Sequence, residues 1–342
     1  MSTVLLLTAI VFAADDAPPT TPTSDVTIEA VYASVDKGLD YLKVEGKAWA
    51  EKRKCASCHH VPFAIWTMEE AKRRGHAIDE TALTELIEFN LAEDDRARIT
   101  QKPPPPKEGE QPRLDVSMGA IYTLLAFADV GELPESPQKR RDAVFAYLTE
   151  TQQPDGNWVY GLNRPPVNAS ETDLKLLTLL MLDRSAKSQA DPQIKTLLEK
   201  ALPHAETLAA DDLSQQYHSL RLLLDVQLGK DAATIQPRVD LLLARQHEDG
   251  GWSQTVEMGS DPYATGQALY ALSVAGLPSD HAAVRNAWGY LLKTQKAEGF
   301  WPMTSRPMKP GEEGAKNLEP ITYAATGWAV LGLLRSSPEI TK

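Results

Sequence analysis

The chain has 342 residues, of which 42% are hydrophobic and 24% are charged, a composition typical of a folded globular protein rather than a disordered or membrane-spanning one. Its formal net charge of −12 disfavours nucleic acid as a partner, because binding to phosphate backbones requires clustered cationic side chains. Acidic partners are disfavoured for the same reason, whereas basic partners are compatible with this charge.

The N-terminus has the pattern of an export signal. Residues 1–14 are apolar and end in small side chains, as in a secretory signal peptide, and they are too few to span a bilayer in the mature protein. No Lys or Arg precedes the apolar run, so the frayed N-terminus of a cytosolic protein is the alternative. Residues 15–27, rich in Pro and Thr, are predicted to be a disordered tether. We therefore expect a periplasmic or otherwise extracytoplasmic protein, with no transmembrane segment in its mature form and a single domain over residues 28–342.

A repeat organises the rest of the chain. Three segments superimpose without gaps, and in each of them a Gln precedes a Trp by six residues across an Asp/Glu-Gly turn. The pairs are Gln152 and Trp158, Gln246 and Trp252, and Gln295 and Trp301. Their spacing predicts a unit of roughly 47 to 49 residues, with one degenerate copy between the first and second pairs. We interpret the three tryptophans as structural residues that pack the turns between neighbouring repeats.

Each repeat is predicted to contain two helices, an amphipathic outer helix before the Gln and a more uniformly apolar inner helix after the turn. Outer helices are expected near residues 28–43, 79–98, 137–152, 191–209, 234–247 and 280–295. Inner helices are expected near residues 62–74, 115–130, 171–186, 213–228, 262–276 and 321–335. No sustained two-residue alternation competes with this helical pattern, so the predicted fold class is all-α.

The Gln-x-x-Asp/Glu-Gly-x-Trp units resemble the repeats of squalene-hopene cyclases and of protein prenyltransferase β-subunits. The segments at residues 261–269 and 323–329, which follow two of these units, strengthen the resemblance. It covers about residues 28–336 and implies an (α/α)6 toroid, a closed double ring of inner and outer helices. A shared fold does not establish a shared function.

The chemistry of those two families is not evident in the sequence. Cyclases of this class protonate an alkene with an Asp-x-Asp-Asp motif, and the nearest segments here, residues 93–95 and 211–212, do not match it. Prenyltransferase β-subunits hold zinc with Asp, Cys and His from separate repeats, but the only two Cys of this chain lie within one pentapeptide. Whether the protein is an enzyme therefore stays open.

That pentapeptide, Cys55-Ala56-Ser57-Cys58-His59, is the most distinctive chemical feature of the chain. In a Cys-x-x-Cys-His segment the two thiols form thioethers to the vinyl groups of one covalently bound haem c, and the His binds the iron as its proximal ligand. Export favours this interpretation, because covalent haem attachment takes place outside the cytoplasm.

Three other interpretations of the pentapeptide remain. A zinc site requires a second, separated pair of ligands, which the chain lacks. A redox dithiol of the thioredoxin type requires a strand followed by a helix, which the pattern does not predict here. A structural disulfide or two free thiols is the third alternative.

The pentapeptide falls in the outer-to-inner connection of the first repeat, the place that the three tryptophans occupy in their own repeats. Phe63 and Trp66, just beyond it, are expected to wall the haem, although ordinary core packing would also explain them. The distal iron ligand is expected to be His218 or Met118, each near the start of an inner helix. An open iron site is the alternative.

The combination of these repeats with Cys-x-x-Cys-His-x-Val-Pro-Phe, here residues 55–63, resembles a family of exported bacterial proteins with squalene-cyclase-like repeats. The resemblance implies a toroidal c-type cytochrome. We therefore predict a monohaem cytochrome that serves extracytoplasmic electron transfer with a redox protein partner. Two alternatives remain open, namely a haem enzyme or sensor that binds a small apolar ligand in the toroid cavity, and a haem-free binding scaffold.

Overall fold

The computed structural model describes residues 26–53, 59–90, 115–116, 118–128, 130, 133, 135–160, 165–167, 170–189, 191–205, 214–307 and 313–341. Within these ranges the chain forms two sets of helices that alternate along the sequence. The outer helices are α1 (Ile28–Arg53), α3 (Glu80–Asn90), α5 (Glu135–Thr151), α7 (Pro192–Ala205), α9 (Ala232–Ala244) and α11 (Ala282–Thr294). The inner helices are α2 (His60–Arg73), α4 (Met118–Phe127), α6 (Glu171–Gln189), α8 (Gln215–Gln227), α10 (Pro262–Val274) and α12 (Glu319–Ser336).

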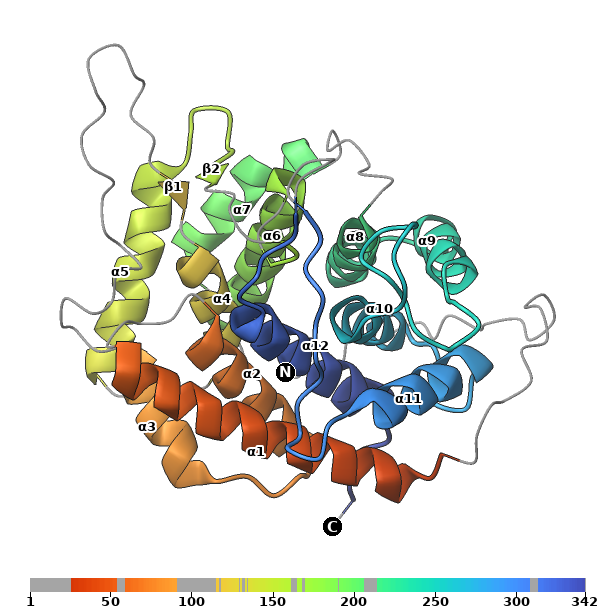
Figure 1. Cartoon of the computed structure of the whole chain (residues 1–342). Helices are drawn as coiled ribbons and strands as arrows, with labels where there is room; N and C mark the ends of the chain where they lie inside the picture. The colour runs from red at the N-terminus through yellow and green to blue at the C-terminus, as the bar shows by residue number, and fades with distance from the viewer. Residues whose placement is uncertain are drawn as a thin grey trace.

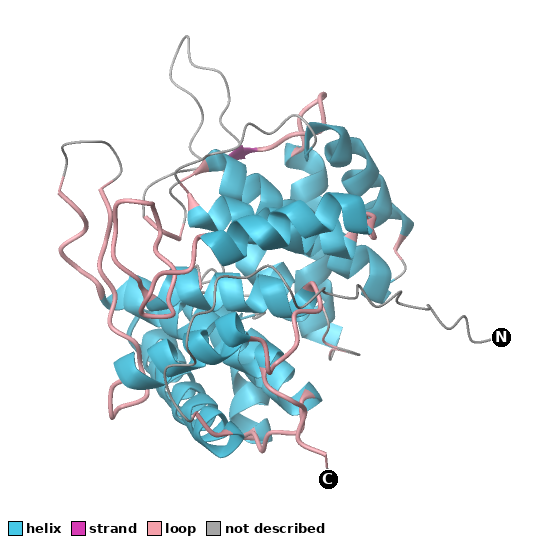
Figure 2. Ribbon diagram, turned by 90° about the vertical axis from the view of Figure 1, so that its right-hand side faces the viewer, coloured by secondary structure: helices cyan, strands magenta, loops and turns pink. Residues whose placement is uncertain are grey.

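The inner helices form a closed ring. Each packs against the next inner helix along the chain, and α12 packs against α2 as well as α10, so the last repeat returns to the first (Figure 1). The outer helices lie around this ring, and the turned view in Figure 2 shows the same helical layers from the side. The structure therefore confirms the predicted all-α class and the (α/α)6 toroid. No helix in the described ranges is both long enough and apolar enough to cross a membrane.

Two details differ from the sequence prediction. Helix α1 continues to Arg53 although it was expected to end near residue 43. Gly46 lies within the added part of the helix, where a Cβ would lie 3.0 Å from the Tyr323 hydroxyl, so the glycine marks a close helix contact. The absence of strands was also predicted, yet β1 (Asp115–Val116) and β2 (Val159–Tyr160) pair in parallel. Strands of two residues are too short to produce a detectable alternation.

The Gln–Trp turns share one hydrogen-bonding pattern. Gln246 Nε2 donates to the carbonyl of Gly250 in its own turn and to that of Ala283 in the next outer helix, both at 2.8 Å. Trp252 Nε1 donates to the Leu242 carbonyl at 2.7 Å, at the end of the preceding helix. The same bonds join Gln152 to Gly156 and Leu197, Trp158 to Leu148, Gln295 to Gly299 and Ser34, and Trp301 to Leu291. Each Gln therefore ties one repeat to the next, and Gln295 ties the last turn to α1.

The turn glycine is required at its position. Gly250 has φ 88°, and a Cβ there would lie 2.3 Å from the Asn286 carbonyl oxygen. Both the backbone conformation and the close approach of the next outer helix exclude a side chain. The geometry that the three turns share thus comes from a Gln, a Gly and a Trp acting together.

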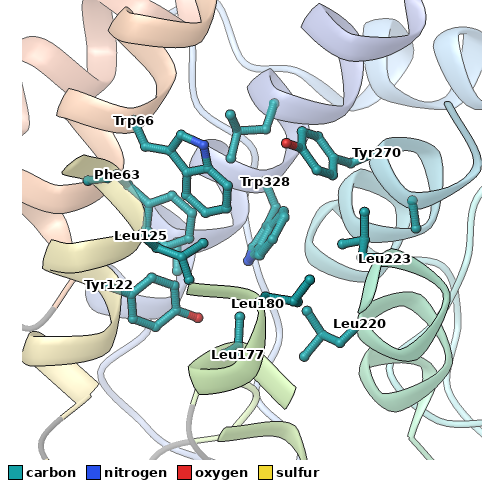
Figure 3. Close-up of a cluster of buried hydrophobic side chains, with 14 of the residues drawn as sticks. Phe63, Trp66, Tyr122, Leu125, Leu177, Leu180, Leu220, Leu223, Tyr270 and Trp328 are labelled. Carbon is teal, nitrogen blue, oxygen red and sulfur yellow. The ribbon is translucent and has the colours of Figure 1, made fainter. Parts of the chain in front are cut away.

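The centre of the ring is filled by side chains. Phe63, Trp66, Tyr122, Tyr270 and Trp328 pack there against one another, together with leucines of α4, α6 and α8 (Figure 3). All of these side chains are buried. Aromatic rings and leucines from each of the inner helices thus meet in one core, which holds the ring together.

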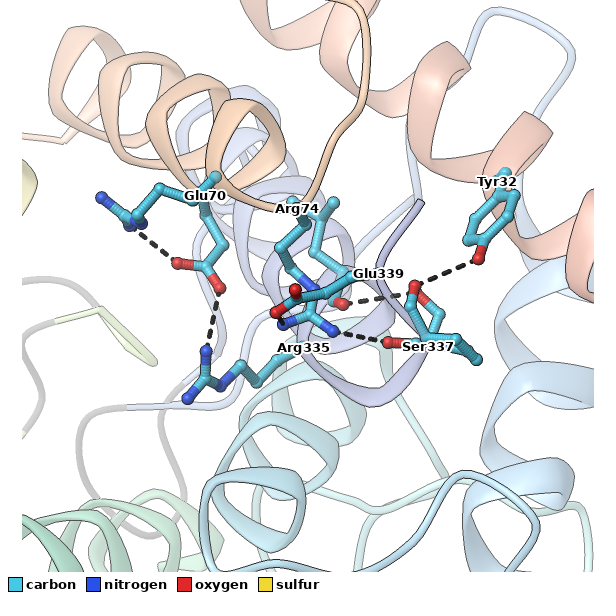
Figure 4. A network of polar contacts seen from close by, with 9 residues as sticks. Tyr32, Glu70, Arg74, Arg335, Ser337 and Glu339 are labelled. Atoms are coloured by element: carbon cyan, nitrogen blue, oxygen red, sulfur yellow. Dashed lines mark hydrogen bonds and ion pairs between the residues drawn. The ribbon is translucent and has the colours of Figure 1, made fainter. Parts of the chain in front are cut away.

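Polar contacts join the first and last repeats at the C-terminal end of α2 (Figure 4). The Arg335 guanidinium lies 3.4 Å from the Glu70 carboxylate, and Arg74 Nη2 donates to the Ser337 carbonyl at 2.6 Å. Burial opposes ionisation of Glu70, but its hydrogen bond to Arg73 and the neighbouring guanidinium charges hold its pKa below the usual value. These contacts fasten the ring where the chain closes on itself.

Candidate functional site

The Cys-x-x-Cys-His segment lies between α1 and α2. Cys55 and Cys58 fall within residues 54–58, outside the described ranges, whereas His59 occupies the position just before the first turn of α2. The segment is therefore in the outer-to-inner connection of the first repeat, as its register predicted.

His59 is buried, with 1% of its surface exposed. Its Nε2 lies 2.8 Å from the carbonyl oxygen of Pro320, in the first turn of α12. Because a carbonyl can only accept, Nε2 carries the proton and donates in this arrangement. The bond joins the start of the first inner helix to the start of the last one and fixes the orientation of the imidazole.

His60 is held in a stack of three rings. Its ring centroid lies 3.8 Å from that of Trp49 on α1 and 4.3 Å from that of Tyr323 on α12, with interplanar angles of 15° and 25°. The Tyr323 hydroxyl donates to the Leu42 carbonyl at 2.7 Å, which anchors that side of the stack. Three elements distant in sequence are thus joined by the residue next to His59.

A pocket of about 290 Å³ opens beside this stack. It is lined by Tyr41, Glu45, Ala48, Trp49, Lys52, His60, Glu319 and Tyr323. Burial and the negative charges of Glu45 and Glu319 raise the pKa of Tyr41 to about 12. The pocket therefore combines aromatic walls with a locally negative potential, and Lys52 is the cation among its lining residues.

Sequence reasoning did not find this pocket. Trp49 and Glu319 carry no motif, and Tyr323 was noted only as part of a repeat segment. The three come together because α1 continues past Gly46 and α12 returns beside α2. His60, the residue after the proposed iron ligand, forms part of the pocket wall.

The other predicted site residues lie apart from the pocket. Phe63 and Trp66 point into the centre of the ring (Figure 3) and are not among the residues that line the pocket. Met118 begins α4, which packs against α2, whereas His218 lies on α8, which packs against α6, α9 and α10. Both are buried. Among the described residues, no cluster of three or more His, Cys, Asp or Glu side chains could hold a metal ion, and the two Cys lie outside those residues.

The C-terminal part of the chain is similar in sequence to squalene-hopene cyclases. The profile of the squalene-hopene cyclase C-terminal domain matches residues 208–341. A squalene–hopene cyclase from Zymomonas mobilis is 36% identical over 96 residues, which are 28% of this chain. The matched stretch spans only 14% of that enzyme, so the similarity concerns a small part of its length.

Comparisons of structures extend over nearly the whole chain. A glycosyl hydrolase of family 88 from Bacteroides vulgatus is similar with a TM-score of 0.60 at 14% identity, covering 91% of this chain and 99% of that one. A type II terpene cyclase from Scytonema is similar with a TM-score of 0.55 at 16% identity, covering 91% and 100%. At such low identity these similarities show the α/α-toroid fold and no activity.

Proposed function

We propose that this squalene-cyclase-like toroid is a monohaem c-type cytochrome, exported from the cytoplasm and used in electron transfer with a redox protein partner. Cys55 and Cys58 would hold the haem through thioethers, and His59 would bind the iron. The observation that carries the proposal is position: the Cys-x-x-Cys-His segment ends at the first turn of α2, next to the 290 Å³ pocket. The similar proteins named above are cyclases and a glycosyl hydrolase, so the proposal rests on this chain's own residues.

The described residues fit a haem in several respects. His59 is buried at the start of α2, where binding of the iron through Nε2 would replace the bond that this nitrogen makes to the Pro320 carbonyl. Trp49 and Tyr323 offer flat apolar walls beside it. A bound haem would supply one-electron chemistry, and these residues would hold it and exclude water from the iron.

Charge fits less well. Haem carries two propionates, and the carboxylates of Glu45 and Glu319 would repel them inside the pocket. Lys52 is the lining residue that could pair with a propionate.

The test is whether the protein carries covalent haem. Full-length protein would be produced in a host competent for haem c maturation, and haem would be assayed by absorption spectroscopy before and after acid-acetone extraction. We expect a Soret band that resists extraction in the wild type and is lost from the protein in Cys55→Ala/Cys58→Ala, with helicity by circular dichroism unchanged. Absence of covalent haem from the folded wild type would contradict the proposal.

A second candidate is a haem-free binding scaffold. It is favoured by the Pro320 carbonyl, which already engages Nε2 of His59, and by the similarity of residues 208–341 to the squalene-hopene cyclase C-terminal domain. If the protein is a haem-free scaffold, the same preparation will contain no haem and the pocket beside His60 will bind another ligand. A carbon monoxide difference spectrum addresses the third alternative, since only an open iron site would support a haem enzyme or sensor.

A further inference from the structure

Glu45 places a carboxylate on the inward face of an outer helix. It lies on α1 one turn after Tyr41 and one turn before Trp49, and all three line the pocket beside α2 and α12. Lys43 and Lys47, two positions to either side, form their ion pairs elsewhere. In the part of the chain that the structure describes, Glu45 has no ion-pair partner. A half-buried carboxylate without a countercharge opposes folding, so its place on this face calls for an explanation.

A second carboxylate lines the same pocket. Glu319 belongs to the first turn of α12, and it too is without an ion-pair partner among the described residues. Lys52, the cation in the wall, is exposed, so solvent screens its charge. Two carboxylates against one ammonium leave the pocket with one uncompensated negative charge.

The rest of the wall is mainly aromatic. The rings of Trp49, His60 and Tyr323 form the stack described above, and the ring centroid of Tyr41 lies 6.2 Å from that of Tyr323. The pKa of Tyr41 is raised first by burial and then by the charges of the two carboxylates, so their potential reaches the aromatic wall. Aromatic rings favour an organic cation over a strongly hydrated metal ion, because they attract the charge through their faces and contact its methyl and methylene groups.

We propose that the pocket beside His60 is a binding site for a small organic monocation of the alkylammonium class, held between the carboxylates of Glu45 and Glu319 and the aromatic wall. The cavity of about 290 Å³ lies at the lower end of the range of roughly 300–1,000 Å³ typical of small-molecule sites, which suits a ligand of few atoms. His59 is not among the described residues that line the pocket, so the cation binds beside the proposed haem rather than in its place.

The test uses choline as a probe, together with its uncharged isostere 3,3-dimethylbutan-1-ol. Binding would be titrated by saturation-transfer NMR at low ionic strength, on the full-length wild type and on Cys55→Ala/Cys58→Ala in parallel. We expect choline to bind both proteins with the same Kd. The isostere, which has the same shape without the charge, should bind about tenfold more weakly.

Substitutions in the wall should act with opposite signs. Glu45→Gln, which keeps the size of the side chain, should weaken choline binding about tenfold, whereas Lys52→Gln should strengthen it about threefold by removing a like charge. An anionic ligand would respond in the opposite sense to both. Glu51→Gln is the matched control, because Glu51 is exposed on the same helix and is not a lining residue; its Kd should equal that of the wild type.

Three results would overturn the proposal. These are absence of saturation transfer from choline, equal affinity for choline and its isostere, and weaker choline binding in Lys52→Gln. Binding confined to Cys55→Ala/Cys58→Ala would also contradict it, since haem would then occupy the pocket. Covalent haem is assayed separately by its Soret band, so the two proposals can fail independently.

Discussion

The Gln–Trp turns and the first connection each join an outer helix to the next inner helix, but the interactions found beside them differ. In each Gln–Trp turn a Gln bridges two backbone carbonyls and a Trp nitrogen bonds a third, as Gln246 and Trp252 do, so the turn is closed by its own residues. The first connection has neither residue. There His59 bonds the Pro320 carbonyl and His60 is stacked between Trp49 and Tyr323. The start of α2 is therefore held by helices α1 and α12.

This difference distinguishes the Gln–Trp turns, which stabilise the fold, from the first connection, which lies beside the candidate site. The repeated turns form the same bonds and contribute stability, and the pocket beside the Trp158 turn is far smaller than the one beside His60. Beside the first connection, His60 at the start of α2 lines the 290 Å³ pocket. The first repeat, which lacks the Gln and Trp of the turns, thus has at the corresponding place two histidines, whose side chains can bind a ligand.

The largest effect is expected from Trp252→Ala. This side chain is fully buried and bonded to Leu242, so its loss should reduce the free energy of unfolding by about 3–5 kcal/mol. Trp49→Ala, beside the first connection, should cost less because Trp49 is only partly buried. Chemical denaturation followed by circular dichroism measures both. Equal losses in the two variants would remove the distinction between scaffold and site.

Asp261, which follows the Trp252 turn, should make stability depend on pH. Burial raises its pKa to about 6, against about 3.8 in the unfolded chain, even though backbone N–H groups donate to it. The folded state therefore binds the proton more tightly, and this residue's contribution to stability falls as pH rises from about 4 to about 6, by up to roughly 3 kcal/mol. Asp261→Asn should lack that dependence. Parallel stability curves for variant and wild type over this range would refute the assignment.

Gln295 joins the last Gln–Trp turn to α1 and so tests how the turns close the ring. Gln295→Ala removes the bonds to the Gly299 and Ser34 carbonyls and should cost about 2 kcal/mol. Gln152→Ala, which breaks the equivalent bonds inside the ring, is the control and should cost a similar amount. Urea unfolding gives both values. A negligible cost for either would show that the turns do not depend on their Gln.

The smallest expected effect belongs to the first connection. His60→Leu keeps an apolar contact of similar size but loses two ring stacks, and we expect a loss of about 1 kcal/mol. The variant should alter ligand or haem spectra far more than it alters stability. A loss as large as that of Trp252→Ala, with spectra unchanged, would mean that His60 is a scaffold residue.

The sequence by itself determined the ring. Helix-period patterning and the Gln, Gly and Trp of the turns act over short distances along the chain, so the positions of the inner and outer helices, the class of fold and the place of His59 in the first connection could all be predicted. The end of α1 could not, because its last turns pack against residues distant in sequence, as Gly46 does against Tyr323.

Only the tertiary structure decided which side chains meet. Trp49 and Tyr323 are far apart in the chain and enclose His60 because the last repeat closes onto the first. Phe63 and Trp66, expected beside a haem, point into the core, because the face that an inner helix turns toward the ring depends on its neighbours as well as on its own sequence (Figure 3).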